Sequence, residues 1–252
     1  MNKKPRREAS KRQTMREVRL KKQRQQRLFV ILGVVIVALL LAGFLIIPPL
    51  MVKSQPVGSI VSITPVARPQ ANGTAAGDPN APVLVEVYED FQCPMCDVYT
   101  KTVEAQLMSN EIASGKVHYV ERQFPIIDRG AANGESHQAA NASLCAANQG
   151  RFWDYHDILF ANQTGENVGD FTDKRLVAFA NSVGLDMNAF NACFSANRFK
   201  STIDADINAG TIAGVSGTPS VFVDGKEVSP GLLPAYADIQ TAINAALAAK
   251  GK

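Results

Sequence analysis

Two cysteines separated by two residues form the most chemically informative motif of the sequence, Cys93-Pro94-Met95-Cys96. The motif follows a predicted strand at the point where a helix should begin. Pro94 suits the first helical position because an N–H there would have no partner inside the helix. Cys93 would then lie at a helix N-terminus, where the dipole and the free amides favour the thiolate. We therefore predict that Cys93 is a nucleophile in disulfide exchange and that Cys96 resolves its mixed disulfides.

Zinc binding and a purely structural short-loop disulfide are the alternatives for this pair. A zinc site needs a second close pair or histidines at a matching spacing. The two other cysteines, Cys145 and Cys193, are single residues 48 positions apart. A redox role is favoured because the spacing and the strand-to-helix position agree with it. The sequence predicts no metal and no cofactor, only a redox-active disulfide between Cys93 and Cys96.

A second motif, Gly217-Thr218-Pro219, precedes a short apolar stretch at residues 220–223. Proline cannot donate a hydrogen bond to a sheet, so it belongs at the start of a strand. The motif resembles the cis-proline loop that faces the Cys-x-x-Cys pair in the thioredoxin superfamily. A cis bond would project the backbone of Thr218 toward Cys93, ready to pair with an extended substrate. An ordinary trans-proline turn is the alternative.

The elements that must position these motifs follow from the pattern of apolar residues. Buried strands are predicted at 83–88, 117–124 and 220–223, and the last is followed by an Asp-Gly hairpin turn and a short strand at 227–228. An amphipathic helix over about 236–247 closes the chain. The residues between the second and third strands, about 125–214, have helical periodicity throughout. The sequence therefore predicts an α/β domain with a helical insertion.

A continuous apolar segment lies near the N-terminus. Residues 28–47 contain no charge, amide or hydroxyl, and as a helix they would span about 30 Å, the thickness of a bilayer core. A cleavable signal peptide has a shorter apolar region and a small-x-small site, which the following Pro48-Pro49-Leu50-Met51 does not offer. We predict one uncleaved transmembrane helix over 28–47.

Charge is divided sharply between the two sides of that segment. Residues 1–27 hold 12 Lys and Arg against two Glu, whereas the remaining residues carry a net charge of −7. The positive-inside rule predicts a cytoplasmic tail at 1–27 and places the rest outside the cytoplasm, in a single-pass cell-membrane protein. Residues 48–80 are expected to form an extracytoplasmic linker and residues 81–252 the folded domain. A domain with a net charge of −7 makes nucleic-acid binding a poor hypothesis, because such binding requires positive charge opposite the phosphates.

The motifs together resemble the DsbA-like branch of the thioredoxin superfamily, over roughly residues 80–250. The matching segments are 90–96 around the cysteines, Phe124-Pro125, residues 149–157 and Gly217-Thr218-Pro219. The resemblance implies a thioredoxin-like fold and a thiol–disulfide oxidoreductase that acts on unfolded or reduced secreted proteins. It also implies a membrane quinone-linked thiol oxidase as the partner that reoxidises the cysteines.

Two positions depart from that family. Met95 stands where strongly oxidising members often have histidine, and it cannot donate a hydrogen bond to the thiolate. Val87 stands six residues before Cys93, where many members carry a buried acid. Glu86 and Glu89 lie close to that position, so the sequence does not identify the proton acceptor.

Cys145 and Cys193 both fall on apolar faces of predicted helices. Outside the cytoplasm, two remaining cysteines more often pair than stay free, so we predict a structural disulfide within the helical insertion. Two buried free thiols, or an electron relay from Cys93 and Cys96, are the alternatives. His118, His137 and His156 are expected to be structural rather than catalytic.

The leading hypothesis is a membrane-anchored protein disulfide oxidoreductase that forms disulfides outside the cytoplasm. Two further hypotheses remain open. One is a reductase or isomerase, which would need a reducing partner on the same side of the membrane. The other, from a different class, is a metal-binding accessory protein on a thioredoxin fold. A copper site would require a suitably placed histidine or a Met-rich segment, and no histidine is near Cys93 in the sequence.

Overall fold

The computed structural model describes residues 27, 31–39, 41, 43, 57–129, 131 and 133–251. Residues 31–39 are helical with exposed side chains, and within these described ranges no helix is long and apolar enough to span a membrane. The predicted tail at 1–27 and the predicted transmembrane helix at 28–47 fall largely outside the described residues and stay predictions. The compact unit that carries both cysteine pairs runs from Val57 to Lys252 and is described below.

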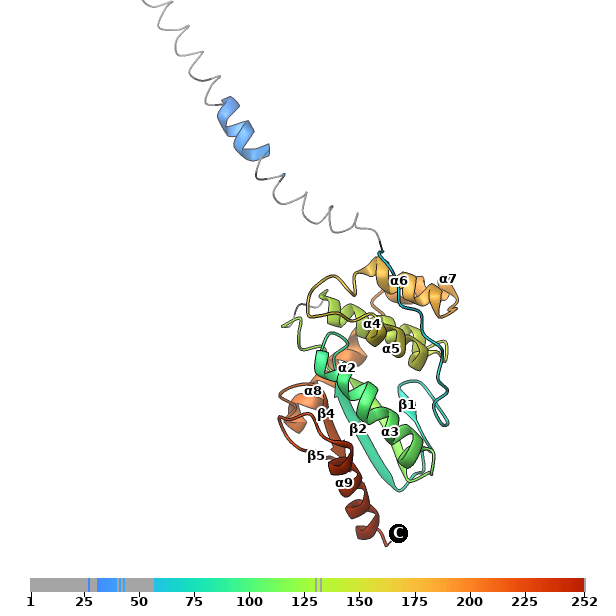
Figure 1. The fold of residues 1–252 in the computed structure, drawn as a ribbon. Helices are drawn as coiled ribbons and strands as arrows, with labels where there is room; N and C mark the ends of the chain where they lie inside the picture. The colour runs from blue at the N-terminus through green and yellow to red at the C-terminus, as the bar shows by residue number, and fades with distance from the viewer. Residues whose placement is uncertain are drawn as a thin grey trace, which may run out of the picture. The chain divides into compact units, whose positions relative to one another are not determined.

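A mixed sheet of five strands forms the centre of this unit (Figure 1). Its order is β1-β3-β2-β4-β5, in which β2 and β3 are parallel and every other neighbouring pair is antiparallel. The strands are β1 (Ala75–Ala76), β2 (Val83–Glu89), β3 (Val117–Gln123), β4 (Ser220–Val223) and β5 (Lys226–Val228). The strand order places β2, which leads to the cysteine motif, at the centre of the sheet.

Alternation of side chains sets which face of the sheet each strand residue covers. In β2, Val83, Val85 and Val87 point into one core, whereas Tyr88 belongs to a separate cluster. The predicted hairpin joins β4 to β5 through Asp224 and Gly225, whose φ angles are 45° and 77°. Positive φ at both central residues is what a two-residue hairpin turn of this kind requires, and Asp-Gly supplies it at low cost.

The helices divide into those that cover the sheet and those of the insertion. Helix α2 (Pro94–Tyr99) continues through a π-helical turn (Thr100–Glu104), α3 (Ala105–Leu107) and a second π-helical turn (Met108–Ile112) as one rod. The insertion contains α4 (Glu135–Ala147), α5 (Phe152–Ala161), α6 (Asp173–Ser182), α7 (Met187–Ser195) and α8 (Lys200–Ala213), and α9 (Tyr236–Ala249) ends the chain. Figure 1 shows α4 to α7 gathered as a group at one end of the sheet, as the predicted helical insertion requires.

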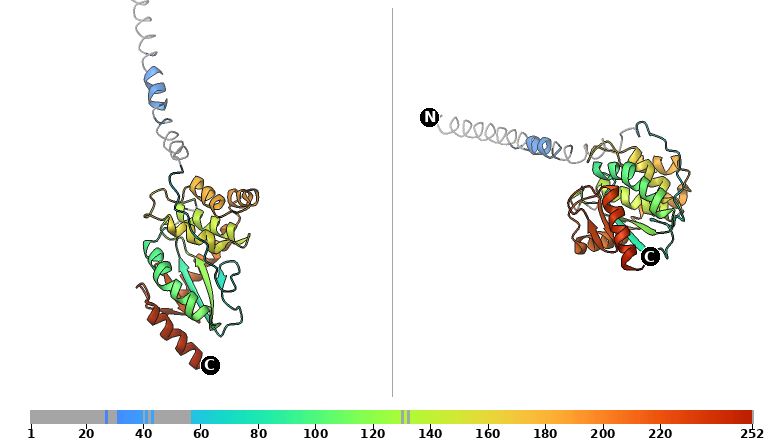
Figure 2. Two further views of the ribbon diagram at one scale, coloured as in Figure 1. Left: turned by 45° about the vertical axis from the view of Figure 1, so that its right-hand side comes forward. Right: turned by 60° about the horizontal axis from the view of Figure 1, so that its bottom comes forward.

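Separate groups of buried side chains hold these layers together. The α2–α3 rod and α9 pack on the same face of the sheet, through Tyr99, Leu107, Ile239 and Ile243. The opposite face contacts α8 through a smaller group that includes Tyr88 and Phe124 beside Ile207. The helical insertion has its own core, which also contains Cys93 and Cys96. Figure 2 shows the sheet and the helical insertion from two further sides. The active-site motif therefore lies where the sheet and the insertion meet.

Residues 57–80, expected from composition to form a linker, pack on the domain from Val57 onward. Ile60 and Ile63 contact the core of the insertion. The backbone N–H of Val61 donates to Asn162 Oδ1 at 2.8 Å, and Asn162 Nδ2 donates back to the Val61 carbonyl at 2.9 Å. Ile60, Val61 and Ile63 lie among Ser and Thr, and this stretch packs on the domain without forming a helix or a strand.

Candidate active site

Cys93 and Cys96 occupy the first turn of helix α2. Cys93 is the N-cap residue with an extended backbone, Pro94 begins the helix, and the N–H groups of Cys96 and Asp97 donate to the Cys93 carbonyl. Both cysteines are free thiols. Cys93 retains 8% of its surface exposed, whereas Cys96 retains none. A reaction partner from solvent therefore has access to Cys93 and not to Cys96.

The two thiols differ in acidity for reasons that the geometry supplies. A hydrogen bond from the Cys96 thiol lowers the pKa of Cys93 to about 6, and the N–H groups of Cys96 and Met95 at the helix start add to this effect against the burial that opposes it. Burial, the Cys93 sulfur and the charge of Glu89 hold the pKa of Cys96 well above its ordinary value. Near neutral pH the reduced pair therefore consists of a Cys93 thiolate and a Cys96 thiol.

The Thr218-Pro219 loop faces the nucleophile. The peptide bond between these residues is cis, and the Cys93 thiol lies 3.1 Å from the Thr218 carbonyl oxygen. Gly214 ends helix α8 in the left-handed conformation, which turns the chain back toward the sheet before β4 begins. Ser220 Oγ bonds the Gly217 carbonyl and Glu227 at 3.0 Å each, so both ends of the loop are fixed.

The loop that precedes Cys93 is held by a buried carboxylate. Asp90 is 2% exposed. Its Oδ1 accepts from the Gln92 N–H at 2.9 Å and from Ser136 Oγ at 2.6 Å, and its Oδ2 accepts from the Ile127 N–H at 3.0 Å. Burial is the largest influence on Asp90 and raises its pKa despite these bonds. Asp90 thus joins the end of β2 to the insertion and fixes the approach to Cys93.

Asp128 continues this network into helix α4. It accepts from the Ser136 and His137 N–H groups at 3.1 and 2.8 Å and from Gln92 Nε2 at 3.0 Å. The N-cap residue of α4, Gly134, has no side chain to do this, so a residue from the preceding loop caps the helix instead. A Cβ at Gly134 would lie 2.2 Å from the Asp128 carboxyl carbon. Glycine is therefore required at this position.

A second buried polar cluster lies between the sheet and helix α5, where the sequence identified no site. Glu89, Glu104, Glu121 and His156 are each at most 2% exposed. His156 Nε2 lies 3.4 Å from Glu121, 3.6 Å from Glu104 and 3.9 Å from Glu89. Burial raises the pKa of all three carboxyl groups. The position where the resembled family carries its buried acid holds Val87, which is part of the apolar core.

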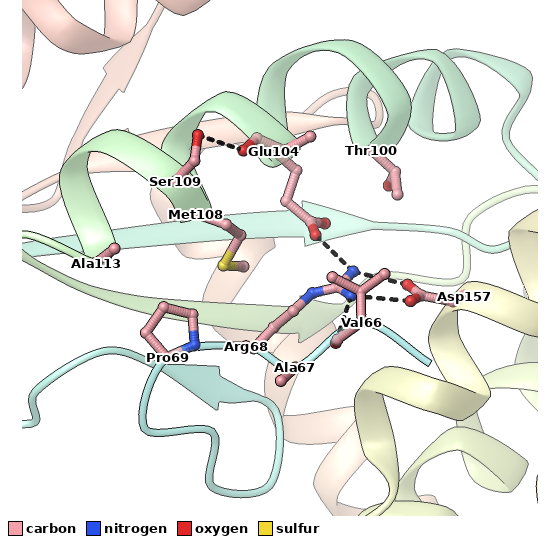
Figure 3. A pocket seen from close by; sticks show the side chains of 11 residues that line it. Val66, Ala67, Arg68, Pro69, Thr100, Glu104, Met108, Ser109, Ala113 and Asp157 are labelled. Atoms are coloured by element: carbon pink, nitrogen blue, oxygen red, sulfur yellow. Dashed lines mark hydrogen bonds and ion pairs between the residues drawn. The ribbon is translucent and has the colours of Figure 1, made fainter. Parts of the chain in front are cut away.

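Arg68 connects this cluster to a cavity. Its guanidinium bonds both Asp157 oxygens, at 2.9 and 2.7 Å, and Glu104 at 3.1 Å. Figure 3 shows the side chain reaching between these two acids from the segment that precedes β1. The cavity has a volume of about 370 Å³, and its walls are mostly apolar apart from Arg68, Glu104 and Asp157.

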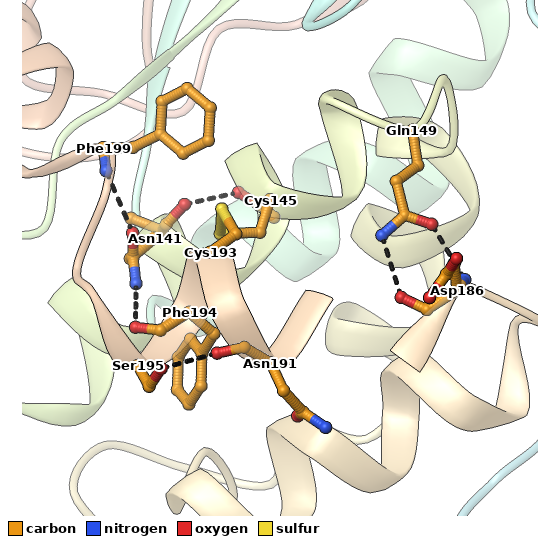
Figure 4. The surroundings of a disulfide bond; sticks show 11 residues. Asn141, Cys145, Gln149, Asp186, Asn191, Cys193, Phe194, Ser195 and Phe199 are labelled. Atoms are coloured by element: carbon orange, nitrogen blue, oxygen red, sulfur yellow. Dashed lines mark hydrogen bonds between the residues drawn. A yellow bond between two sulfur atoms is a disulfide. The ribbon is translucent and has the colours of Figure 1, made fainter. Parts of the chain in front are cut away.

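The other two cysteines form a disulfide that joins α4 to α7 within the insertion (Figure 4). Both are buried. Asn141 lies beside them and donates to the Phe194 carbonyl at 3.1 Å while accepting from the Phe199 N–H at 3.2 Å. The disulfide therefore lies in a packed helical region, which is the setting of a structural bond.

Two kinds of known protein are similar in sequence to this chain. It is 28% identical over 160 residues to a probable disulfide bond formation protein D of Bacillus cereus, covering 61% of this chain and 71% of that protein. It is 34% identical over 150 residues to the Na(+)/H(+) antiporter NhaA 3 of Salinispora tropica, covering 60% of this chain. In that second case it spans about a fifth of the relative's length, 21%.

Solved structures give the same architecture. Oxidised BdbD from Bacillus subtilis superposes with a TM-score of 0.62 at 22% identity, over 76% of this chain and 100% of that one. This likeness supports the thioredoxin-like fold with its helical insertion. The thioredoxin family itself matches residues 70–245, which include the sheet, both cysteine pairs and the Thr218-Pro219 loop. The chain therefore belongs to the thioredoxin family.

Proposed function

We propose that this protein is a thiol–disulfide oxidoreductase that forms disulfides in proteins outside the cytoplasm through Cys93 and Cys96. One observation carries the proposal. Within a single helical turn, an accessible cysteine has a pKa lowered to about 6 while its neighbour is fully buried with a raised pKa. This asymmetry is what an attacking and a resolving thiol require.

The oxidising reaction is a two-electron exchange in two steps. A substrate thiolate attacks Cys93 of the Cys93–Cys96 disulfide, and the Cys96 sulfur leaves and takes up a proton. A second substrate thiolate then attacks the substrate sulfur of the mixed disulfide and expels Cys93. Cys93 is a good leaving group because its thiolate is stabilised at the helix start. The substrate loses two electrons and two protons, and Cys93 and Cys96 gain the electrons.

The surroundings of Cys93 suit an unfolded polypeptide. The Thr218 carbonyl opposite Cys93 can accept from the backbone of an extended chain. Met95 and Val98 of helix α2 are exposed apolar residues. Val168 is also exposed. Its loop is held near the cysteine motif because the neighbouring Asn167 N–H donates to Gln92 Oε1 at 2.6 Å. Apolar contact combined with backbone pairing would select reduced, unfolded chains without requiring one sequence.

The cellular setting follows from the charge pattern and the disulfide. The basic tail and the apolar segment predict an anchored protein whose domain lies outside the cytoplasm, and the Cys145–Cys193 bond fits an oxidising compartment. Continued turnover needs an oxidant to accept the two electrons from reduced Cys93–Cys96. The proposed acceptor is a membrane quinone-linked thiol oxidase.

The proposal is tested by oxidative refolding of a reduced, unfolded secreted protein, together with the reduction potential of Cys93–Cys96. If this protein is an oxidant, its oxidised form added in stoichiometric amounts should restore the activity of the secreted protein. The reduction potential of Cys93–Cys96 should then be about −120 mV. A potential near about −270 mV would instead identify a reductase. The Cys93→Ser, Cys96→Ser double variant is the control, because it keeps the fold and lacks the exchanging pair.

A further inference from the structure

The buried cluster beside helix α5 contains ligand atoms that nothing in the described part of the chain satisfies. Oxygens of Glu89, Glu104 and Glu121 and the Nε2 atom of His156 are buried without hydrogen-bond partners. One ligand atom each from Glu89, Glu121 and His156 lies within 4.8 Å of the others. Buried polar atoms without partners are costly. A bound species in the space between them would remove that cost.

The orientation of His156 is already fixed for such a role. Its Nδ1 atom lies 2.9 Å from Asp157 Oδ1, so in the neutral ring a proton on Nδ1 would bond the carboxylate and leave the Nε2 lone pair facing the three glutamates. A carboxylate behind a histidine is the usual outer partner of a metal-binding imidazole. Arg68 holds Asp157 in turn through both carboxylate oxygens.

The spacing of the ligand atoms also fits one ion. The separations of 3.4, 3.6 and 3.9 Å between His156 Nε2 and the glutamate oxygens are too long for good hydrogen bonds. Ligands at 2.0–2.1 Å from a tetrahedral zinc ion lie about 3.4 Å from one another. The ligand atoms of Glu89, Glu121 and His156 already lie within 4.8 Å of one another, so they would have to draw together, and Glu104 would have to turn toward them, to enclose such an ion.

Charge balance points to a cation. The cluster and its flank hold three buried carboxyl groups, Glu89, Glu104 and Glu121, and the half-buried Asp157, beside Arg68 and the imidazole of His156. Ionised carboxylates in a low-dielectric interior need compensating charge or must take up protons. A divalent ion supplies that compensation, and the competing arrangement is an imidazolium at His156 among partly protonated carboxyl groups, with no ion.

We propose that Glu89, Glu121 and His156, with Glu104 as the fourth ligand, bind one divalent first-row metal ion, for which Zn²⁺ is the best match. One imidazole and several carboxylates form a mixed nitrogen–oxygen set, whereas Ca²⁺ and Mg²⁺ prefer oxygen alone. No cysteine belongs to the group among the described residues. The site contains neither cysteine and its binding does not depend on the proposed function, although Glu89 also acts on the pKa of Cys96.

The cavity offers a route from solvent as far as Glu104. The cavity of Figure 3 has Glu104 and Asp157 on its wall, and Glu104 is shared between the cavity and the cluster. Arg68 lies across this route, bonded to both acids. Displacement of its guanidinium from Glu104 would free that carboxylate to turn to the incoming ion.

The test uses the full-length protein, oxidised so that its cysteines are in disulfides, stripped with a chelator and titrated with ZnCl₂ by calorimetry. We expect one ion per chain and, by X-ray absorption at the zinc edge, a shell of nitrogen and oxygen only. Glu121→Gln should weaken binding by at least about tenfold and Asp157→Asn by about 10–100-fold. Glu111→Gln is the matched control, because Glu111 is equally buried but bonds Lys116, Tyr236 and Gln240 outside the cluster.

Absence of stoichiometric binding to the wild-type protein would overturn the proposal and indicate protonated carboxyl groups. A sulfur atom in the zinc shell, or unchanged affinity in a folded Glu121→Gln variant, would overturn it as well. The stoichiometry and the absorption spectrum use the wild-type chain, so they decide the matter even if a variant fails to fold.

Discussion

The Cys93 thiol lies 3.1 Å from the carbonyl oxygen of Thr218, a residue 125 positions later in the chain. Central strand β2 leads to Cys93, and Thr218 directly precedes the proline at the entrance to β4, which pairs with β2. Sheet pairing therefore brings the nucleophile and its facing loop together. A substrate held on this loop would have its sulfur presented to Cys93.

The acidity of Cys93 is directly measurable. Because the Cys96 thiol and the first amides of α2 stabilise the thiolate, Cys93 should titrate with a pKa of about 6 in the reduced protein. Ultraviolet thiolate absorbance followed against pH should show one transition near that value, absent in Cys93→Ser. A midpoint at or above the unperturbed ~8.5 would contradict the assignment.

The same pKa values predict how the reduction potential varies with pH. The pKa of Cys93 is lower in the folded reduced protein than in the unfolded chain. The Cys93 thiolate therefore adds to the stability of the reduced folded protein above pH ~8.5, and this added stability is lost as the pH falls through about 6. Reduction takes up two protons below pH 6 and one above it, because Cys96 stays protonated.

This change in proton uptake should halve the slope of the potential against pH. The slope should be about 59 mV per pH unit below pH 6 and about 30 mV above it. Equilibrium titration against glutathione between pH 5 and 8 measures both. One slope of about 59 mV across the whole range would mean that Cys93 is not a thiolate near neutral pH.

Removal of the Cys145–Cys193 disulfide should affect stability rather than chemistry. The bond closes a loop with a sequence separation of 48, which on the chain-entropy model corresponds to about 4 kcal/mol. Cys145→Ala with Cys193→Ala should lower the denaturation midpoint and leave exchange by Cys93 intact. Loss of turnover at unchanged stability would instead indicate an electron relay between the two cysteine pairs.

Gly134 should be intolerant of any side chain. A Cβ there would meet the Asp128 carboxylate at 2.2–2.4 Å, which would displace the cap of α4 and the Gln92 contact before Cys93. Gly134→Ala should cost about 1–3 kcal/mol of unfolding free energy, measured by denaturant titration. Gly165→Ala is the matched control, since its nearest neighbour would lie at 3.4 Å, and an equal loss in both variants would contradict the argument.

The segment before β1 should contribute to the stability of the domain through Arg68. This side chain is buried between Glu104 and Asp157, so Arg68→Met leaves the buried Glu104 and the half-buried Asp157 carboxylates without their partner and should destabilise by about 3–5 kcal/mol. Lys101→Met removes an exposed ion pair with Asp97 and should cost at most about 1 kcal/mol. Chemical denaturation of both variants provides the comparison.

The sequence predicted the parts of the fold that leave a periodic or local signal. The alternating strand 83–88, the Asp-Gly turn at 224–225 and the helical block were readable because period, turn chemistry and capping are local properties. The packing of Arg68 on the domain was not, because its contacts with Glu104 and Asp157 join residues distant in sequence.

The residues of the candidate site were likewise predictable only in part from the sequence. Cys93 and Cys96 were identified from spacing and Glu89 was noted near the proton-acceptor position, whereas its grouping with Glu121 and His156 was missed. A signal for it exists in the sequence: Glu121 follows Val117 and Tyr119 in alternation on the buried face of β3, and Glu89 follows Val85 and Val87 in the same way. An acid that alternates with core residues in this way indicates a buried carboxyl group. His156, however, comes from helix α5, and only the tertiary fold brings it near these acids.

Mass spectrometry of trapped mixed disulfides tests the central claim, that Cys93 attacks and Cys96 resolves. Cys96→Ser, mixed with a reduced secreted protein under mild oxidation, should accumulate long-lived adducts joined through Cys93, because the resolving thiol is missing. Cys93→Ser should accumulate almost none, since Cys96 has no exposed surface. Adducts formed mainly through Cys96, or equally through both cysteines, would contradict the account.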